Sequence, residues 1–475
     1  MLRPAIAEHL RLVYPLLADS HFDGEPEMGN WADDELGGAN LGDARLNQRL
    51  VKLATRFAEQ PTASIANACG DWAETIAAYR FFDQASTDKR GLNWQSILQP
   101  HIDGSEARMA QHPVVLCLQD TTELDFNGQD IEELGPLSYE AQRGMYLHPT
   151  YAVTPQREPL GVIDAWMWAR EPKGADGTRP GISESTRWIE GYERVAETAA
   201  NMPGTRLIYV ADREADMVGL MQRAQDLGTP ADWLIRAQHN RCLPQGGKLW
   251  AAVLAEVPLG EIEFTLASRQ GQPERSVRQQ VRVKATTVPA ADGQPIRVTC
   301  LIATEIDPPP GCKAVEWRLL SNREVVDLDA AVTLIDWYRC RWEIETLFHV
   351  LKNGCRVESL QLGSRPKLEL ALAVYLVVSW RLARLVRLGR IHPDWPAELF
   401  FDKTEWTGAF ILNKKKPPAK PPTVREVVRL IAQLGGFLAR KGDGEPGVKS
   451  LWLGFQALRH FANGVEIARK HGYAF

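Results

Sequence analysis

The sequence lacks the features that mark secreted, membrane-spanning and zinc-binding proteins. Its seven cysteines, scattered from Cys69 to Cys355, contain no Cys-x-x-Cys pair, which argues against a zinc module and for a reducing compartment. No charged-then-apolar signal pattern opens the chain. The most apolar stretch, residues 368–378, contains Glu369 and is too short to span a bilayer. We therefore expect a cytoplasmic protein with no membrane partner.

An excess of positive charge and an internal repeat are also absent. The 55 Lys and Arg residues are outnumbered by 60 Asp and Glu residues, which gives a net charge of −5. Any nucleic-acid surface must therefore be a local concentration of basic side chains. With 475 residues, 44% of them hydrophobic and 24% charged, the chain has the composition of a globular protein of about two to four domains.

Residues 1–105 have the pattern of helices. One helix starts after Gly42-Asp43 and is ended by Pro61, and residues 72–82 predict another. The first helix has apolar residues at the spacing of a buried face, namely Leu46, Leu50, Leu53 and Phe57. Its remaining flank is basic, with Arg45, Arg49, Lys52 and Arg56. Such a flank is typical of a module that grips duplex DNA, but also of a solvated amphipathic helix, and the pattern leaves both interpretations open.

From residue 114 the pattern changes to short strands. Two apolar runs, residues 114–118 and 207–211, each lead into an aspartate, Asp120 and Asp212. Residues 216–226 predict a helix. Further strands are predicted at residues 151–153, 161–168 and 233–237. Strands that alternate with helices in this way predict a mixed α/β sheet with helices around it.

The second half of the chain differs from this pattern. Residues 243–314 contain three stretches of alternating polar and apolar residues that predict an antiparallel insertion: 261–266, 277–284 and 296–303. Residues 317–320 return to the sheet, and residues 368–388 predict a long buried helix. Lysines and prolines at residues 414–422 predict an extended basic linker, because proline cannot continue a helix. Residues 426–475 are expected to be helical, with an apolar face formed by Leu451, Trp452, Phe455 and Leu458.

The segment from Tyr338 to Lys352 has the pattern of one helix with a mixed polar face. At about 100° per residue, five side chains fall within a stripe roughly 80° wide: Tyr338, Arg341, Glu345, His349 and Lys352. The opposite side predicts a buried face formed by Leu334, Ile344, Leu347 and Leu351. Trp337, Trp342 and Phe348 interleave with the polar residues and predict a packed, partly dry site. One carboxylate among cations suits a divalent metal held beside a polyanion.

Three acids stand out by position: Asp120, Asp212 and Glu345. Each aspartate alone is explained as a turn or capping residue. Together, the acids suit phosphodiester cleavage, which uses two Mg²⁺ ions about 3.5–4 Å apart. Carboxylates brought that close repel one another without a metal, so the cluster would be costly for structure alone.

Other acids fit this role less well. Glu343 points about 140° away from Tyr338 on the same helical wheel, so Glu345 is preferred. Asp216 is a candidate supporting residue or cap, and Asp125 lies beyond the strand end.

The chain resembles the bacterial cut-and-paste DDE transposases with a ribonuclease-H-like core, in the subgroup marked by a Tyr-Arg-Glu-Lys helix. The resemblance lies in three motifs: Asp120-Thr121-Thr122, Asp212-Arg213-Glu214-Ala215-Asp216 and Tyr338-x2-Arg341-x3-Glu345-x6-Lys352. It extends over nearly the whole chain through Leu41-Gly42-Asp43, Ala78-Tyr79-Arg80-Phe81-Phe82 and Leu434-Gly435-Gly436-Phe437. The helix motif is highly specific, whereas the aspartate motifs alone are weak.

The resemblance implies a fold and a domain order. We expect an α/β chain whose ribonuclease-H-like mixed-sheet core, residues 106–242 and 315–395, contains a β-rich insertion, residues 243–314. A helical domain, residues 1–105, would bind the terminal inverted repeats of a transposable element. A second helical domain, residues 396–475, would form a homodimer in which each active site cleaves the DNA end held mainly by the partner. The resemblance thus implies a bacterial, nucleoid-associated location.

The resemblance also implies a reaction and residue roles. Asp120, Asp212 and Glu345 would hold two Mg²⁺ ions per active site, for which Mn²⁺ can substitute. The element would be excised through a DNA hairpin, and its 3′ ends would be joined to target DNA. Phosphate near a flipped base would be held by Tyr338, Arg341, Lys352 and Arg236, and Trp317 would stack on that base. Arg45 and Arg49 are the candidate DNA contacts of the N-terminal domain.

Two alternatives to an active transposase remain at this stage. The first is a relative that binds DNA but has lost catalysis, which the presence of all three acids argues against. The second is a different two-metal nuclease or phosphatase on the same core, which would need neither paired DNA ends nor a dimer. The ordinary interpretation of Trp317 is a core tryptophan.

Overall fold

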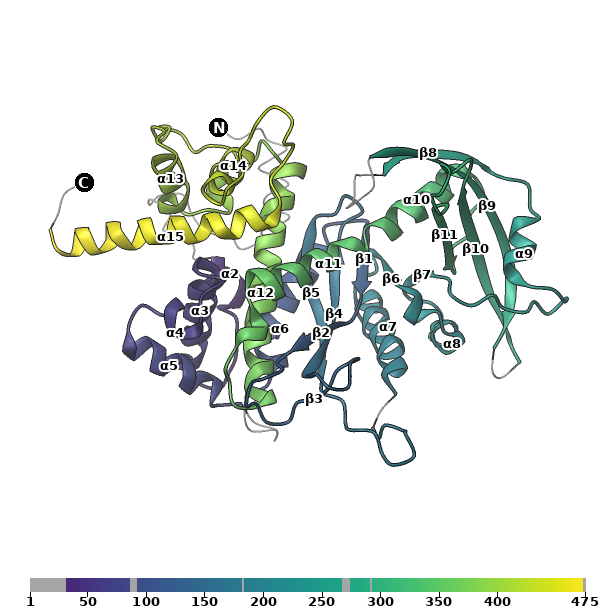
Figure 1. Ribbon diagram of the computed structural model, residues 1–475, viewed down its shortest axis with the longest axis horizontal. Helices are drawn as coiled ribbons and strands as arrows, with labels where there is room; N and C mark the ends of the chain where they lie inside the picture. The colour runs from purple at the N-terminus through teal and green to yellow at the C-terminus, as the bar shows by residue number, and fades with distance from the viewer. Residues whose placement is uncertain (1–30, 86–91, 182, 267–273, 291–292, 473–475) are drawn as a thin grey trace. The chain divides into compact units, whose positions relative to one another are not determined.

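A computed structural model describes residues 31–85, 92–181, 183–266, 274–290 and 293–472 (Figure 1). Residues 1–30 and 86–91 of the expected N-terminal domain lie outside the described residues. By its internal contacts the chain divides into two compact units. The first is formed within residues 1–111, 121–181 and 343–475, and the second within residues 112–120 and 182–342.

The first unit begins with helices, as predicted. They are α2 (Trp31–Leu36), α3 (Ala44–Glu59), α4 (Ile65–Ala68), α5 (Trp72–Phe82) and α6 (Trp94–Met109). The carboxylate of Asp43 caps α3 by accepting a hydrogen bond from the backbone N–H of Arg45. The apolar positions Leu50, Leu53 and Phe57 are buried, while Leu46 is only half-buried.

Two long strands form a hairpin in the first unit, β4 (Arg143–Val153) and β5 (Pro159–Trp168). They include the predicted strands but extend further. Two short strands that were not predicted, β2 (Thr122–Asp125) and β3 (Gly135–Pro136), pair with β4. The predicted long buried helix is α12 (Arg365–Ile391), which contacts α3, α6 and β5. This helix therefore packs against both the helical and the strand parts of the unit (Figure 1).

The C-terminal part of the first unit contains α13 (Lys403–Leu412), α14 (Val424–Leu434) and α15 (Val448–Lys470). The expected non-helical linker lies between α13 and α14, and the expected apolar face of α15 is buried at Leu451, Trp452, Phe455 and Leu458. The prediction of continuous helix over residues 426–475 is wrong at residues 435–447. There α14 is ended by Gly435-Gly436, and Gly436 adopts a φ of 93° that favours glycine.

The second unit is built on a mixed sheet. Its parallel strands are β1 (Val114–Gln119), β6 (Arg206–Ala211) and β7 (Asp232–Arg236). The sheet continues with antiparallel strands in the order β11 (Glu316–Ser321), β10 (Pro295–Glu305), β9 (Arg275–Pro289) and β8 (Gly260–Leu266). Strands β8 to β10, which lie in the predicted insertion of residues 243–314, therefore continue the same sheet and join it through β11.

Four helices accompany this sheet: α7 (Glu184–Asn201), α8 (Val218–Asp226), α9 (Leu249–Leu254) and α10 (Leu328–Arg339). A glycine lets α7 approach β1 closely, because a Cβ on Gly191 would lie 2.2 Å from the side chain of Gln119. Gln119 directly precedes Asp120. The packing of α7 thus fixes the end of the strand that carries the first candidate acid.

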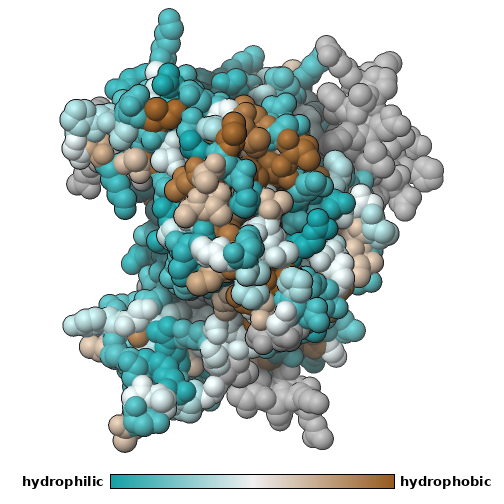
Figure 2. All heavy atoms as spheres, turned by 90° about the vertical axis from the view of Figure 1, so that its right-hand side faces the viewer, coloured by the Kyte–Doolittle hydropathy of each residue, from teal (hydrophilic) through white to brown (hydrophobic). Residues whose placement is uncertain are grey.

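Figure 2 looks onto the end of the second unit that carries α9 and strands β8 to β10, where apolar side chains gather among polar ones. Exposed apolar residues lie at the end of α9, at Leu254, and just after the helix, at Val257 and Leu259. Within the described ranges, no helix combines the length and the apolar character that crossing a bilayer requires. The mixed α/β fold with helical N- and C-terminal regions agrees with the predicted fold class.

Candidate functional site

Asp120 and Asp212 follow neighbouring parallel strands at one edge of the sheet. β1 and β6 pair in register up to Gln119 and Ala211, so the next residue of each strand is one of the two aspartates. Neighbouring strands lie about 4.8 Å apart. Both side chains are half-buried. The sheet therefore places these two residues at neighbouring positions, at the same end of adjacent strands.

The two aspartates have different partners. Nη1 of Arg341 lies 2.5 Å from Oδ2 of Asp120, and the same guanidinium lies 5.1 Å from the ring centroid of Trp342. The carboxylate of Asp212 accepts a hydrogen bond of 2.8 Å from the backbone N–H of Glu214. It thereby caps the short 3₁₀ turn η2 (Arg213–Ala215). The capping interpretation thus holds for Asp212, through its Oδ1 atom.

Tyr338 lies among these groups. Burial raises the pKa of its phenol, and the nearby guanidinium groups of Arg341 and then Arg236 counteract that rise, while Asp212 adds to it. These interactions bring a tyrosine and two arginines to the edge of the sheet at which the aspartates lie. The second unit therefore carries a compact group of two acids, two permanent cations and a phenol.

The prediction of one continuous helix from Tyr338 to Lys352 is wrong. α10 ends at Arg339, α11 (Trp342–His349) follows, and η3 (Val350–Gly354) is a π-helical segment that contains Lys352. The N–H of Arg341 bonds to the carbonyl of Tyr338, a step of three residues, and the N–H of Cys355 bonds to the carbonyl of Val350, a step of five. Because each irregular step rotates the residues that follow, one wheel of about 100° per residue does not describe this segment.

Burial along this segment corrects two expectations. Tyr338 is 6% exposed, so it is enclosed and not presented on an open face, whereas Trp342 is 57% exposed, so it does not help to dry the site. The expected apolar face is confirmed, because the following residues are buried: Leu334, Ile344, Leu347 and Leu351.

Glu345 and Glu343 have opposite environments on α11. Glu343 is buried, and its carboxylate accepts a hydrogen bond of 2.8 Å from Nε of Arg387 on α12. Glu345 is exposed in the first turn of the helix. Glu343 therefore fastens α11 to α12, and Glu345 is the acid of the pair that faces solvent. Glu345 belongs to the first unit, as Lys352 does, whereas the two aspartates belong to the second.

The aspartate pair suits a hard divalent cation, because carboxylate oxygens are the ligands that Mg²⁺ prefers and a cation offsets the repulsion between them. In the described part of the chain, no three His, Cys, Asp or Glu residues are grouped so that they could hold a metal ion. The fit to a metal thus rests on Asp120 and Asp212.

Three protein-family models match the chain. The one described as Transposase DNA-binding matches residues 28–87, the Transposase DDE domain matches residues 189–380, and the Transposase Tn5 dimerisation domain matches residues 377–474. The chain belongs to the DDE transposases of bacterial insertion sequences. The DDE match includes Asp212 and Glu345, and Asp120 precedes it.

This membership establishes the broad activity of the transposase. It is a DNA transposase with a metal-dependent nuclease function, since the DDE family uses divalent metals, typically Mg²⁺. The DNA-binding and dimerisation matches show that it binds DNA and forms dimers.

The four basic residues on the flank of α3 fall into two pairs with different surroundings. On α3, Lys52 and Arg56 both contact the carboxylate of Glu74 on α5, at 3.1 and 2.9 Å. They hold the two helices together. Arg45 is exposed and pairs only locally with its cap residue Asp43, and Arg49 forms no salt bridge with another described residue. Two of the four cations thus support the fold, whereas Arg45 and Arg49 form no ion pair with another helix in the part of the chain that the structure describes.

Trp317 and Lys352 have defined surroundings as well. Trp317, half-buried on β11, stacks on Phe264 of β8 with ring centroids 5.3 Å apart and planes inclined by 16°. Nζ of Lys352 lies 3.4 Å from a carboxylate oxygen of Glu358. Phe264 was not predicted as a neighbour of Trp317, since only the pairing of distant strands brings the two rings together.

Asp216 supports the segment that follows β7. Its buried carboxylate accepts hydrogen bonds from the backbone N–H groups of Gln238 (2.6 Å) and His239 (2.8 Å) and pairs with Arg241. It thereby shapes the chain just beyond Arg236. Asp216 also stands at the C-terminal end of η2, and its role as a supporting residue of the metal site stays a prediction. No local sequence signal identified Arg241 as its partner.

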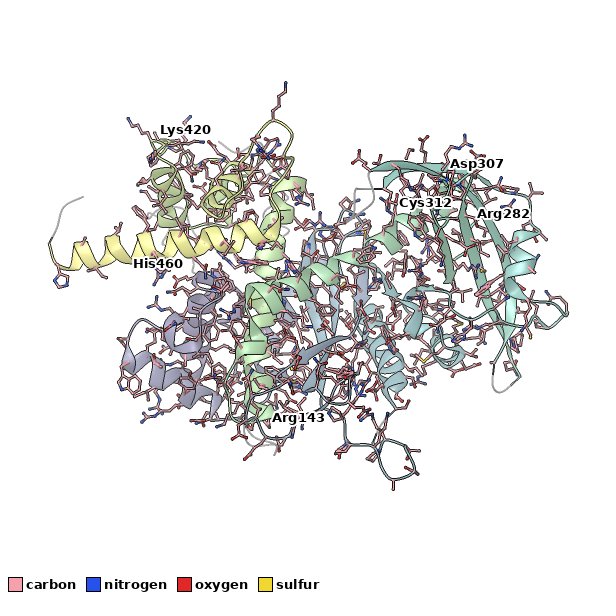
Figure 3. The ribbon with its side chains drawn as sticks, viewed as in Figure 1. Arg143, Arg282, Asp307, Cys312, Lys420 and His460 are labelled. Atoms are coloured by element: carbon pink, nitrogen blue, oxygen red, sulfur yellow. The ribbon has the colours of Figure 1, made fainter. Side chains whose placement is uncertain are left out.

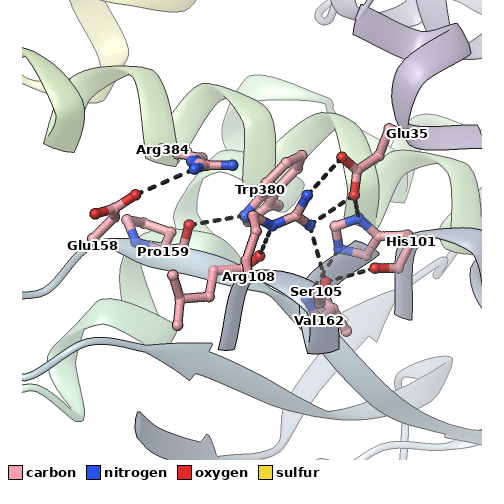
Figure 4. A network of polar contacts seen from close by, with 10 residues as sticks. Glu35, His101, Ser105, Arg108, Glu158, Pro159, Val162, Trp380 and Arg384 are labelled. Atoms are coloured by element: carbon pink, nitrogen blue, oxygen red, sulfur yellow. Dashed lines mark hydrogen bonds and ion pairs between the residues drawn. The ribbon is translucent and has the colours of Figure 1, made fainter. Parts of the chain in front are cut away.

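The acidic opening of the chain contains a structural residue. Glu35 of α2 is buried, and its carboxylate accepts hydrogen bonds from Nδ1 of His101 and from Nη1 and Nη2 of Arg108 on α6 (Figure 4). Burial alone would raise the pKa of Glu35, but Arg108, followed by His101, lowers it to about 2. This network therefore fastens α2 to α6.

The same network continues to β5 and α12. Nε2 of His101 accepts the backbone N–H of Val162 (3.0 Å), so His101 is neutral, and burial lowers its pKa. Nε of Arg108 donates to the carbonyl of Leu160 (2.6 Å), and its guanidinium lies 4.5 Å from the ring of Trp380 on α12 (Figure 4). A segment within the DNA-binding match is thus tied to the interior of the first unit.

Proposed function

We propose that this transposase excises its element and joins it to target DNA, with Asp120, Asp212 and Glu345 as the residues that hold the catalytic metals. The observation that carries the proposal is the register of β1 and β6, which sets Asp120 beside Asp212. Glu345 is the candidate third ligand, because it is exposed on α11 while Glu343 is committed to Arg387. Two Mg²⁺ ions bound there would activate the attacking oxygen and stabilise the leaving oxygen.

The residues around the acids would position the DNA backbone. The permanent charges of Arg341 and Arg236 suit a scissile phosphate, and the ion pair of Arg341 with Asp120 would open as phosphate and metal arrive. The phenol of Tyr338, whose pKa is raised, stays protonated and would donate a hydrogen bond. Lys352 would reach the phosphate by giving up its exchangeable pair with Glu358.

The proposed reaction begins with hydrolysis of one strand at each terminal inverted repeat. The freed 3′-hydroxyl attacks the opposite strand and forms a hairpin, which a second hydrolysis opens before the 3′ end attacks target DNA. Hairpin formation bends DNA sharply, which is relieved when a base leaves the stack. Trp317 would receive that base, with Phe264 behind its ring. The homodimer would pair two ends, each cleaved by the partner of the subunit that grips it.

Cleavage of a DNA duplex that contains the element's ends tests the assignment. With Mg²⁺ or Mn²⁺, we expect Asp120→Asn, Asp212→Asn and Glu345→Gln to lose more than about 100-fold in rate, because each removes a metal ligand. A matched control is Asp336→Asn, which removes an exposed acid of α10 that pairs only with Arg339 in the adjacent turn. Equal cleavage by wild type and Asp212→Asn would refute the assignment of Asp212 as a metal ligand, and no cleavage by the wild type would leave DNA binding without catalysis. Cleavage that needs neither paired ends nor a dimer would indicate another nuclease.

A further inference from the structure

The loop between α13 and α14, residues 413–423, carries a positive surface that the fold leaves uncompensated. Its four lysines are exposed, and none forms a salt bridge with another described residue: Lys414, Lys415, Lys416 and Lys420. No acidic residue occurs in the sequence between Glu405 and Glu426. Figure 3 labels Lys420 on this lysine loop. In a chain with a net charge of −5, this is a local concentration of cations.

The lysine loop is held in place at both ends. At its start, the N–H of Lys415 bonds to the carbonyl of Phe410 (2.9 Å), and the side-chain amide of Asn413 donates to the carbonyl of Leu430 on α14 (3.0 Å). At its end, the carbonyl of Pro422 accepts the N–H of Ala397 (2.8 Å). Because the ends are fixed, the lysines stand on an ordered segment.

Proline restricts the loop between these anchors. Four prolines fix their backbone φ angles there: Pro417, Pro418, Pro421 and Pro422. A chain that is already restricted loses less conformational entropy when it binds a partner. The loop therefore combines unpaired charge with little cost of ordering its backbone.

We propose that the lysine loop binds the phosphate backbone of duplex DNA without sequence preference. Lysine is a hydrated point charge that contacts phosphate but carries no fork for reading bases. The chain already binds DNA, so the polyanion that complements this surface is present in its working complex. The proposal goes beyond the proposed function, because the loop lies within the dimerisation match, residues 377–474, and contains none of the catalytic candidates.

Binding of the full-length dimer to a random-sequence duplex, with a chelator present so that no cleavage occurs, tests the proposal. The variant Lys414→Gln/Lys415→Gln/Lys416→Gln is compared with Lys403→Gln/Lys441→Gln/Lys449→Gln, which removes the same charge from exposed sites of the same region. If three phosphate contacts are lost, the slope of log affinity against log salt becomes shallower by about 2.7. Between 50 and 200 mM salt, wild type should then lose about 40-fold more affinity than the loop variant.

The outcomes separate contact from net charge. We expect the control triple to keep the wild-type slope, and Lys414→Arg/Lys415→Arg/Lys416→Arg to keep it as well, because the charges remain. Equal shallowing in both glutamine triples would overturn the proposal, since only overall charge would matter. A wild-type slope in the loop variant would also overturn it and would leave an acidic protein surface as the partner. Because cleavage is not read, failure of the metal-site assignment cannot produce either result.

Discussion

Two arginine–carboxylate pairs in this transposase use the same chemistry for different ends. Glu35 lies on α2 beside one cation, with two bonds from Arg108 and one from the neutral ring of His101. Asp120 pairs with Arg341 but lies beside a second acid, Asp212. The first arrangement neutralises one buried charge. The second places like charges together at the end of a sheet, where the carboxyl ends of parallel strands meet.

The difference teaches how to separate a structural pair from a functional one. In the Glu35 network, Arg108 and His101 both stabilise the ionised carboxylate, and the pKa of Glu35 falls to about 2. The two aspartates occupy neighbouring positions at the end of the sheet, an arrangement of like charges that a bound cation would stabilise. Removal of Glu35 should therefore damage the fold, whereas removal of Asp120 should damage catalysis.

The largest expected contrast is in stability. Glu35→Gln leaves the charge of Arg108 buried without a counter-ion, which we expect to cost about 3–5 kcal/mol. Asp120→Asn should cost less than Glu35→Gln, because Asp120 itself is half-buried and the loss of its carboxylate relieves repulsion with Asp212. Urea unfolding of both variants measures this. The double variant Glu35→Gln/Arg108→Met should recover part of the lost stability. Equal losses in Glu35→Gln and Asp120→Asn would show that the two pairs do not differ in their structural role.

The next largest expected effect is a loss of stability at acidic pH, which comes from the pair of Glu35 with Arg108. The pKa of Glu35 is about 2 in the folded chain, against an ordinary value of 4.5. Its contribution is therefore present above pH 4.5 and is lost as pH falls toward 2, by about 3 kcal/mol in total. The pKa of His101 is also lowered, from 6.5, so protonation of this histidine below pH 6.5 likewise reduces the stability of the fold. Thermal melts of Glu35→Gln across this range should show a flatter pH dependence than wild type, and parallel curves would contradict the assignment.

A smaller effect is expected on the rate of one step of the proposed reaction. We expect Trp317→Ala and Lys352→Ala to slow hairpin formation on the order of tenfold relative to first-strand nicking, since stacking on a flipped base contributes about 1–3 kcal/mol. Strand-resolved cleavage of one labelled DNA end measures both steps in a single reaction. Variants that slowed nicking alone would refute the base-stacking and phosphate-clamp roles.

The smallest effect concerns Arg49, which forms no salt bridge with any other residue that the structure describes. Arg49→Ala should make the salt dependence of end binding shallower by about 0.9 in slope, the value for one phosphate contact. Lys52→Ala, on the same helix but bound to Glu74, should leave the slope unchanged. Filter binding over a series of salt concentrations measures both. A change in Lys52→Ala equal to that in Arg49→Ala would mean that the ion pair does not decide which cations reach DNA.

Much of the fold could be predicted because its local signals are strong. The helix over residues 72–82 and the buried helix over 368–388 match α5 and α12, since apolar periodicity and capping residues act within a few turns. Strands β2 and β3 were not predicted, because each is short and is defined by its pairing with β4. The break at Cys340 was also not predicted, since no proline or glycine marks it.

The site was predicted in its residue types more than in its geometry. Apolar runs before Asp120 and Asp212 pointed to strand ends, but only the pairing of β1 with β6 made them neighbours. The choice of Glu345 over Glu343 gains support from the hydrogen bond between Glu343 and Arg387, because these two residues are 44 positions apart in the chain and no local pattern predicts their contact. Phe264 behind Trp317 and the network of Glu35 left no pattern in the sequence, because their partners come from distant segments.

The order of residue types along the chain alone determined which segments are helices and strands, which acids end the strands, and which family motifs are present. These features depend on neighbours a few positions apart. Tertiary structure decided which charges are paired across the fold, as with Lys52 against Arg49 and with the lysine loop, and which acid of α11 is buried and which is exposed, as with Glu343 against Glu345. Whether a charged side chain meets an opposite charge depends on segments far apart in sequence, and that contact sets the cost of its burial and its freedom to bind DNA.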